Sequence, residues 1–166
     1  MSRHDFREVY MPSNCPVCGA GTAKKVKRTY ETKYDGQIVT LPNTKMLRCS
    51  NCNEEFLLPD QARAISIEVK NEVRRLTGLL SPGQILAIRK KLSLTQAQLE
   101  RLFDQGPKVI TRWESGKVIQ NKNADTILRM LDRKPTLLSL VKEIERARDQ
   151  RRKQKRSEPL EVVVSR

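Results

Sequence analysis

The four cysteines of the chain form two pairs, each with two residues between the thiols. One pair is Cys15 and Cys18, the other is Cys49 and Cys52, and thirty residues lie between the pairs. Each pair suits a tight turn that points two thiolates at one ion, and four thiolates complete the tetrahedral shell that Zn²⁺ prefers. A closed shell leaves no position for water or substrate. We therefore expect these four cysteines to bind one structural zinc ion per chain.

Two alternative interpretations of the cysteine pairs are a redox-active dithiol and two disulfide bonds. A redox dithiol would be expected next to a βαβ pattern, which the sequence lacks, and disulfides would require a secreted protein. Residues 1–6 lack the apolar core of a signal peptide, and no apolar run approaches the roughly 18 residues of a membrane span. We expect a cytoplasmic protein with reduced thiols and no membrane contact. The single histidine, His4, is expected to be a surface residue.

Residues 94–117 predict two short helices joined by a tight turn. The first helix is expected at 96–103, directly after Thr95, a residue type that caps helix N-termini. The second helix is expected at 107–114, after a turn at 104–106. This spacing is typical of a helix-turn-helix, whose second helix enters the major groove of DNA.

The second of these helices has an apolar side and a polar side. Val109, Ile110 and Trp113 share the apolar side, which we expect to be buried, and polar residues recur at i, i+3, i+4 and i+7 on the opposite side. Arginine or lysine can bridge the two acceptors of guanine, and threonine can contact a base or a phosphate. The residues expected to contact DNA are Gln96, Lys108, Thr111, Arg112, Ser115 and Lys117. The alternative interpretation is a helix face that is merely solvated.

The charge of the chain favours a polyanionic partner. Its 166 residues carry 33 Lys+Arg against 19 Asp+Glu, a formal net charge of +14. The net charge is +2 over residues 1–60, +7 over 61–145 and +5 over 146–166. We therefore expect a polyanion to bind the part of the chain that follows the cysteines. Three Phe, three Tyr and one Trp are too few for the stacking surface of a single-strand binder, so double-stranded DNA is the expected partner.

A β-hairpin is expected to hold the two cysteine pairs together. Loose alternation predicts a strand over 25–34, Asp35-Gly36 predicts a turn, and 37–41 would be the return strand. Pro42-Asn43 is expected to stop that strand, and 44–48 would form a third one. Because roughly 45 residues bury little apolar surface, metal binding should supply much of the folding free energy of this part.

Helices are expected from residue 61 onward. A linker helix at 61–76 would end at Thr77-Gly78, and Ser81-Pro82 would begin the next helix. The five helices that should follow are placed at 82–92, 96–103, 107–114, 124–131 and 135–148. The predicted fold class is α+β, mostly α: a small β-rich zinc-binding module followed by a five-helix helix-turn-helix domain.

Five segments are predicted along the chain. They are a flexible lead-in at 1–13, a zinc-binding module at 14–60, a linker helix at 61–79, a DNA-binding domain at 80–145 and a basic tail at 146–166. The tail has few apolar residues, so a frayed helix or disorder is expected from 146 onward. Residues 160–164 could pair as a strand, with a partner that the sequence does not indicate.

The segment 94–117 resembles the Xre/Cro class of helix-turn-helix proteins, in which Leu-Thr-Gln begins the first helix and Arg-Trp-Glu-x-Gly ends the second. With the upstream Cys-Pro-Val-Cys-Gly and Cys-Ser-Asn-Cys motifs, residues 15–145 resemble the MqsA-type antitoxins, which join a YgiT-type zinc finger to such a domain. Glu100 and Pro107 depart from the usual pattern.

The resemblance implies an antitoxin of a bacterial type II toxin–antitoxin operon. Such a protein would dimerise through its C-terminal domain, bind a palindromic operator, repress its own operon and hold a toxin through the zinc module. By position, Lys108 and Arg112 fall where the recognition helix of that family reads bases.

The helix at 135–148 is the expected dimer surface, because it offers more apolar area than one small domain needs for its own core. The residues concerned are Leu137, Leu138, Val141 and Ile144. Two further hypotheses are a stand-alone regulator without a toxin and a zinc-ribbon adaptor that binds RNA. The sequence shows no catalytic Ser/His/Asp or Cys/His arrangement, phosphate-binding Gly loop or open metal site, so we expect no catalytic residues and no enzyme activity.

Overall fold

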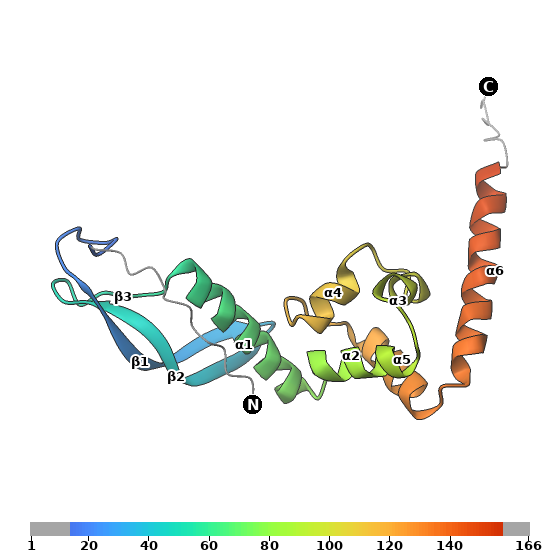
Figure 1. Cartoon of the computed structure of the whole chain (residues 1–166), viewed down its shortest axis with the longest axis horizontal. Helices are drawn as coiled ribbons and strands as arrows, with labels where there is room; N and C mark the ends of the chain where they lie inside the picture. Colours follow the sequence, from blue (N-terminus) through green and yellow to red (C-terminus); the bar gives the residue numbers. More distant parts are fainter. Residues whose placement is uncertain (1–13, 158–166) are drawn as a thin grey trace, which may run out of the picture. The chain divides into compact units, whose positions relative to one another are not determined.

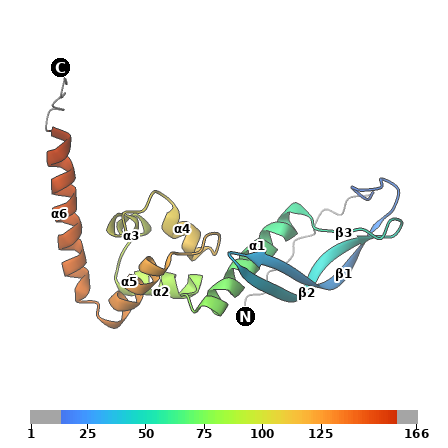
Figure 2. The same ribbon diagram turned by 180° about the vertical axis from the view of Figure 1, so that it is seen from behind.

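Residues 14–157 are described by the computed structural model of the chain, which has a three-stranded antiparallel sheet and six helices (Figures 1 and 2). The fold class is therefore α+β. The chain divides into two compact units, Met1–Val73 and Arg74–Arg166, which are treated separately below. The predictions for the lead-in at 1–13, for His4 and for a strand at 160–164 lie outside the described residues.

The first unit is built on a long antiparallel hairpin of β1 (Ala23–Tyr34) and β2 (Gln37–Cys49). A short strand, β3 (Glu55–Phe56), pairs with the other edge of β2. The predicted turn at Asp35-Gly36 is confirmed. Asp35 has a φ of 47° and Gly36 a φ of 77°, and a two-residue hairpin turn of this type requires positive φ at both positions.

The prediction that Pro42-Asn43 stops the second strand is wrong. β2 runs through both residues, and the segment 44–48 is its continuation rather than a third strand. The pairing shifts at this point, since Arg28 faces Thr44 while Tyr30 faces Leu41. Two residues of β2 therefore oppose one residue of β1. A β-bulge of this kind accommodates a proline, which cannot donate a ladder hydrogen bond, and the left-handed backbone of Asn43, whose φ is 57°.

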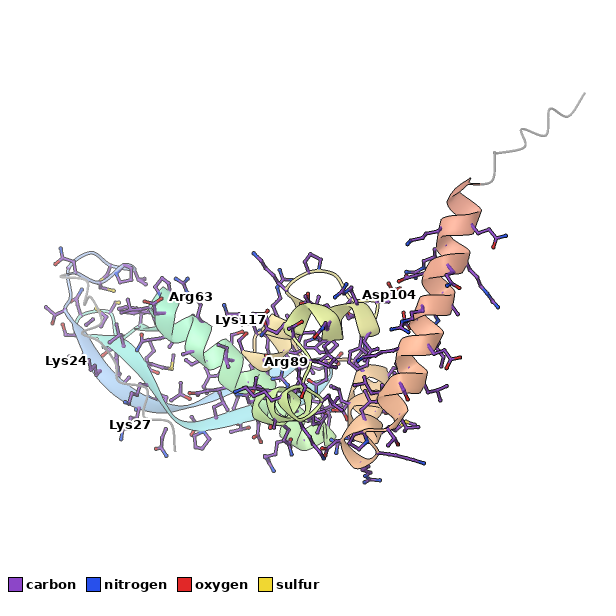
Figure 3. The ribbon with its side chains drawn as sticks, turned by 45° about the vertical axis from the view of Figure 1, so that its right-hand side comes forward. Lys24, Lys27, Arg63, Arg89, Asp104 and Lys117 are labelled. Carbon is purple, nitrogen blue, oxygen red and sulfur yellow. The ribbon has the colours of Figure 1, made fainter. Side chains whose placement is uncertain are left out.

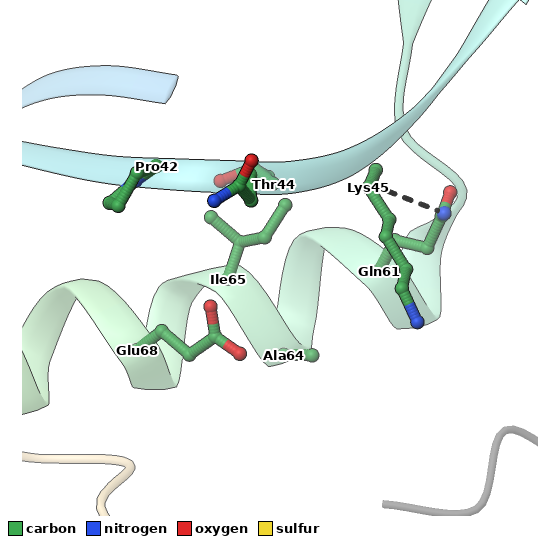
Figure 4. A pocket seen from close by; sticks show the side chains of 8 residues that line it. Pro42, Thr44, Lys45, Gln61, Ala64, Ile65 and Glu68 are labelled. Carbon is green, nitrogen blue, oxygen red and sulfur yellow. Dashed lines mark hydrogen bonds between the residues drawn. The ribbon is translucent and has the colours of Figure 1, made fainter. Parts of the chain in front are cut away.

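Helix α1 (Pro59–Thr77) begins two residues before the predicted helix at 61–76. Ile65 is buried and points toward Thr44 of β2 (Figure 4). Gln61 fixes the start of the helix, because its side-chain oxygen accepts from the Leu58 N–H at 2.9 Å and its amide nitrogen donates to the Lys45 carbonyl at 3.4 Å. Gly78, with a φ of 68°, follows the helix in the left-handed conformation that commonly ends helices.

The second unit contains the remaining helices around one apolar core. They are α2 (Pro82–Lys91), α3 (Gln96–Leu102), α4 (Val109–Glu114), α5 (Lys122–Arg133) and α6 (Leu137–Ser157). Ser81 and Thr95 each form a capping box, at the starts of α2 and α3 respectively, and the Asn121 side chain caps α5. The residues at the centre of the core include Ile85, Leu99, Ile110, Trp113 and Leu128.

The last helix is longer than predicted. The expectation of a frayed or disordered chain from residue 146 is wrong up to Ser157, because α6 continues without interruption to that residue. Arg, Lys, Gln and Ala, which make up most of this segment, are good helix formers, so it loses little by being helical. Side-chain pairs also support it: Arg148 bonds Glu145 one turn earlier at 2.7 Å. None of the helices within residues 14–157 is long and apolar enough to cross a membrane.

Candidate metal centre and nucleic-acid interface

The two cysteine pairs meet at one end of the hairpin. The four sulfur atoms all lie within 4.8 Å of one another. Cys15 Sγ lies 3.8 Å from Cys52 Sγ, and Cys18 Sγ lies 3.6 Å from Cys49 Sγ. A tetrahedral ion with bonds of about 2.3 Å to sulfur places its ligands about 3.8 Å apart. A disulfide would require about 2.05 Å. The cluster therefore has the size of a four-thiolate metal site, and the interpretation as two disulfides is wrong.

Backbone N–H groups in the two turns point at the sulfur atoms. Asn51 and Cys52 donate to Cys49 Sγ at 3.3 and 3.4 Å, and Val17 donates to Cys15 Sγ at 3.3 Å. Gly19 follows the first pair with a φ of 70°, and Asn53 follows the second with a φ of 60°, so the chain leaves both turns through the left-handed conformation. These N–H groups stabilise thiolates, the form of cysteine that binds metal.

The pKa values of Cys18, Cys49 and Cys52 are shifted in different directions. N–H groups of Ala20 and Gly21 and the side chain of Asn51 lower the pKa of Cys18 to about 5. The Cys52 N–H lowers the pKa of Cys49. The pKa of Cys52 is raised to about 12, because burial and the neighbouring sulfurs outweigh the stabilising N–H of Glu54. Four sulfurs at this spacing hold all four negative charges only when a cation lies between them.

Gly21 is a site residue that the sequence patterns do not reveal. A Cβ at this position would lie 2.4 Å from Cys49 Sγ and 2.8 Å from the Asn51 side chain. The Gly21 carbonyl also accepts from the Cys15 N–H at 2.8 Å, so the two turns approach each other across this residue. A glycine between the first cysteine pair and the first strand is the only sequence signal for this contact.

Most of the residues expected to contact DNA lie on the surface of the α3–α4 segment. Thr111 and Arg112 of α4 are exposed, and so is Ser115, which directly follows the helix. Lys117, two residues further on, is exposed as well (Figure 3). Lys108 is exposed as well, but α4 begins at Val109 and not at 107 as predicted. Lys108 precedes the helix with a φ of 65°, outside the helical conformation.

Gln96 is half-buried and connects α3 to α4. Its side-chain oxygen accepts from the Thr111 hydroxyl at 2.9 Å, and its amide nitrogen donates to Glu114 Oε2 at 2.8 Å. Of the residues expected to contact DNA, Gln96 and Thr111 are thus brought together. The apolar side of α4 is buried as expected, with Trp113 only 2% exposed.

Glu114, the last residue of α4, pairs internally. Arg89 of α2 donates to its two carboxylate oxygens at 2.5 and 3.0 Å, and also bonds the Leu94 carbonyl at 2.9 Å. Burial raises the pKa of Glu114, but the hydrogen bonds from Arg89 and Gln96 outweigh it and hold that pKa below its ordinary value. The pair fixes α2, α3 and α4 against one another.

Glu100 has a role that the sequence patterns do not indicate. Lys108 makes no side-chain cap for α4, and the Glu100 carboxylate accepts from the Ile110 N–H at 3.2 Å instead. The carboxylate therefore satisfies one of the free N–H groups in the first turn of α4. The departure of this residue from the Xre/Cro pattern has a local structural explanation.

A buried polar network fixes the start of α5 against the residues just before α2. Asp125 accepts from the Leu80 N–H at 2.7 Å, from the Gln120 amide at 3.0 Å and from Arg129 at 2.6 Å. Arg74 donates to Gln120 at 3.2 Å, and the fully buried Arg74 is thereby tied to the same network. These residues hold the core in place and do not face the polar side of α4.

Comparisons with known proteins agree on one family. The family model described as "Antitoxin component of bacterial toxin-antitoxin system, MqsA" matches residues 13–142. Antitoxin MqsA of Escherichia coli (strain K12) is 28% identical over 129 residues, which cover 77% of this chain and 98% of that protein. Antitoxin HigA-2 of Vibrio cholerae serotype O1 is 30% identical over 74 residues, covering 45% of this chain and 69% of that protein.

Among the solved structures that are similar is the N-terminal domain of the E. coli protein MqsA, with 22% sequence identity and a TM-score of 0.30. The match covers 39% of this chain and 97% of that chain. The family match spans both the cysteine cluster and the α3–α4 segment, and it agrees with the resemblance carried by the sequence motifs. The chain belongs to the MqsA family of antitoxins, components of bacterial toxin–antitoxin systems.

Proposed function

We propose that this antitoxin also represses its own operon, by binding a palindromic operator through a helix-turn-helix made of α3 and α4. The observation that carries the proposal is the exposed polar side of α4, formed by Thr111 and Arg112 and continued by Ser115 directly after the helix, opposite a buried apolar side. A short helix held this way can lie in the major groove with its early residues against base edges.

Electrostatics around α4 supports the same proposal. The three acidic side chains of the segment are all engaged: Glu100 with the Ile110 N–H, Asp104 with Arg152 and Glu114 with Arg89. The basic side chains of Lys108, Arg112 and Lys117 form no ion pair with any residue in 14–157. The surface therefore carries basic side chains without an ion-pair partner among the described residues, while two of its three carboxylates are ion-paired, which favours a polyanion.

The cysteine cluster fits one structural Zn²⁺ per chain, held by Cys15, Cys18, Cys49 and Cys52. Thiolate donors at tetrahedral spacing suit this ion, and all four positions would be filled by protein. The ion would hold the two turns of the hairpin together and would have no catalytic position. We propose the corresponding division of the chain: a zinc-binding module at 14–60, a linker helix at 61–79, a DNA-binding domain at 80–145 and a basic tail after it.

The partner of the antitoxin would be a toxin, held by the zinc-binding module. Co-expression with the product of the neighbouring gene tests this, because the two proteins should purify together and separate when residues 14–60 are removed. Failure to purify together would favour the stand-alone regulator.

A homodimer through the C-terminal domain would place two copies of α4 on the two halves of a palindrome. Leu137, Leu138 and Val141 of α6 pack partly against the core of their own unit, so they are less available than expected. The exposed apolar residues beside them are Met130 at 52%, Leu140 at 50% and Ile144 at 43%. They line a cavity of about 310 Å³ between α3, α5 and α6, the surface that we assign to the dimer.

The DNA-binding proposal is tested with two substitutions that remove one positive charge each. Arg112→Ala should weaken operator binding by ~1–3 kcal/mol and relax the preference for one base pair. Lys117→Ala, at an expected phosphate contact, should weaken binding evenly across sequences and flatten its salt dependence. Binding of both variants to operator and random duplexes at several salt concentrations measures this. Unchanged specificity of Arg112→Ala would show that α4 is not the recognition helix.

A further inference from the structure

The C-terminal half of α6 carries a charge that the family match does not account for. Residues 146–157 hold seven basic side chains and one acidic one, Asp149. The family match ends at residue 142, so this segment is an extension of the matched region. It is a continuous part of a 21-residue helix and not a loose tail.

The extension is fixed beside the turn between α3 and α4. Arg152 bonds both carboxylate oxygens of Asp104 in that turn, at 3.0 and 2.6 Å. One turn earlier in α6, Arg148 lines the same cavity as Leu102 and Phe103 at the end of α3. The basic half of α6 therefore lies against the segment that leads into α4.

Several positive charges of this helix are not compensated by acidic partners among the described residues. Arg148 and Arg152 are four residues apart, as are Lys142 and Arg146, and like charges at this spacing destabilise a helix. The exposed Arg146, Arg151 and Lys153 have no ion-pair partner among the residues that the structure describes. Exposed ion pairs such as Arg152–Asp104 contribute little free energy in return. A polyanionic partner would explain why the charges are present.

We propose that residues 146–157 of α6 are a second DNA-contacting element, which binds backbone phosphates of the duplex next to the base pairs that α4 reads. The inference rests on the proposed role of α4 as the recognition helix. Asp104 positions the element through Arg152, and Arg146, Arg151 and Lys153 supply the contacts. Contacts of this kind carry no sequence information, but they raise affinity and make it salt-dependent.

The test compares full-length wild type with the variant R146Q/R151Q/K153Q, which keeps the ion-paired Arg148 and Arg152. The control, K24Q/K25Q/K27Q, removes the same charge from exposed positions of β1. The probe is a duplex that wild type selects from a random pool, in a short form and in a form extended by about one helical turn at each end. Circular dichroism verifies that both variants keep the helix content of wild type.

For the α6 variant, the slope of log affinity against log salt should fall by up to about 3, at about 0.9 per lost phosphate contact. The α6 variant should also lose the preference for the long duplex that wild type shows. The control variant should keep the salt slope of wild type and its preference for the long duplex. Equal losses in the two variants, or an unchanged slope in the α6 variant, would overturn the proposal. If wild type binds selected and random duplexes equally, the proposed function fails, which is a distinct outcome.

Discussion

Individual side chains fix the start of α4 and its position relative to α3. Glu100 is the clearest case, because its carboxylate caps a helix whose own N-terminal residue, Lys108, offers no side-chain cap. The same contact fixes the distance between α3 and α4. The sequence motif predicts where the two helices lie, but not this bond, since it joins residues ten positions apart and depends on the left-handed backbone of Lys108.

Glu100→Ala should lower the free energy of unfolding of the second unit by about 1 kcal/mol, the usual cost of losing an N-terminal cap. Glu100→Gln keeps an acceptor oxygen and should lose less. Urea unfolding followed by the fluorescence of Trp113, the only tryptophan, measures both. Arg101→Ala, at an exposed neighbouring position of α3, is the control. Equal stability of Glu100→Ala and this control would contradict the capping role.

Cys49→Ser should remove the metal from the chain and unfold the hairpin. The reason is that Cys49 is buried among the other three sulfurs and metal binding supplies much of the folding free energy of so small a sheet. Elemental analysis of protein purified without chelator should find one zinc per wild-type chain and almost none in the variant. Ser50→Ala, which changes the adjacent non-ligand, should keep the metal. Wild type without zinc would rule out the proposed ion.

At the scale of secondary-structure elements, short-range patterns predicted most boundaries. The turn at Asp35-Gly36 follows from local chemistry, and the helix starts after Ser81 and Thr95 follow from their capping boxes. The bulge at Pro42-Asn43 could not be predicted in the same way, because it depends on the strand that faces it. The length of α6 was underestimated for a similar reason, since Arg152 pairs with a residue 48 positions earlier.

The second unit should lose stability as pH falls below about 4. Burial raises the pKa of Asp125, but hydrogen bonds from Arg129, the Leu80 N–H and Gln120 outweigh it and lower that pKa below its ordinary value. A group whose folded pKa is depressed stabilises the fold above its unfolded pKa, about 3.9 for Asp, and loses that contribution as pH falls through the folded pKa. The Glu114 pKa is lowered too and acts in the same direction.

Urea unfolding between pH 7 and pH 2 measures this effect. Asp125→Asn should cost about 2 kcal/mol at pH 7, because it removes a charged acceptor from a buried network, and should flatten the loss of stability toward low pH. Asp132→Asn, which breaks an exposed pair with Lys91, is the matched control and should behave like wild type. A pH profile that is the same for Asp125→Asn and wild type would assign the acid sensitivity to other groups.

At the scale of the whole molecule, one chain carries both the four-cysteine cluster and the α3–α4 segment. The four cysteines lie close enough together to hold one metal ion, and the family match spans both them and the α3–α4 segment. The motifs predicted the cysteine cluster and place the proposed DNA contacts on the α3–α4 segment, where they stay a prediction. They could not predict which apolar residues of α6 remain exposed, because that depends on how α6 packs against α5.

Footprinting of the full-length protein on the DNA upstream of its own coding sequence tests the central claim most directly. One α4 helix reads only a few base pairs, so a dimer should protect two symmetric half-sites centred ~34 Å apart or at a multiple of that distance. Arg112→Ala should lose the protection at protein concentrations where wild type shows it. A wild-type footprint without symmetry, or no protection at any sequence, would contradict the account of this antitoxin as an operator-binding repressor.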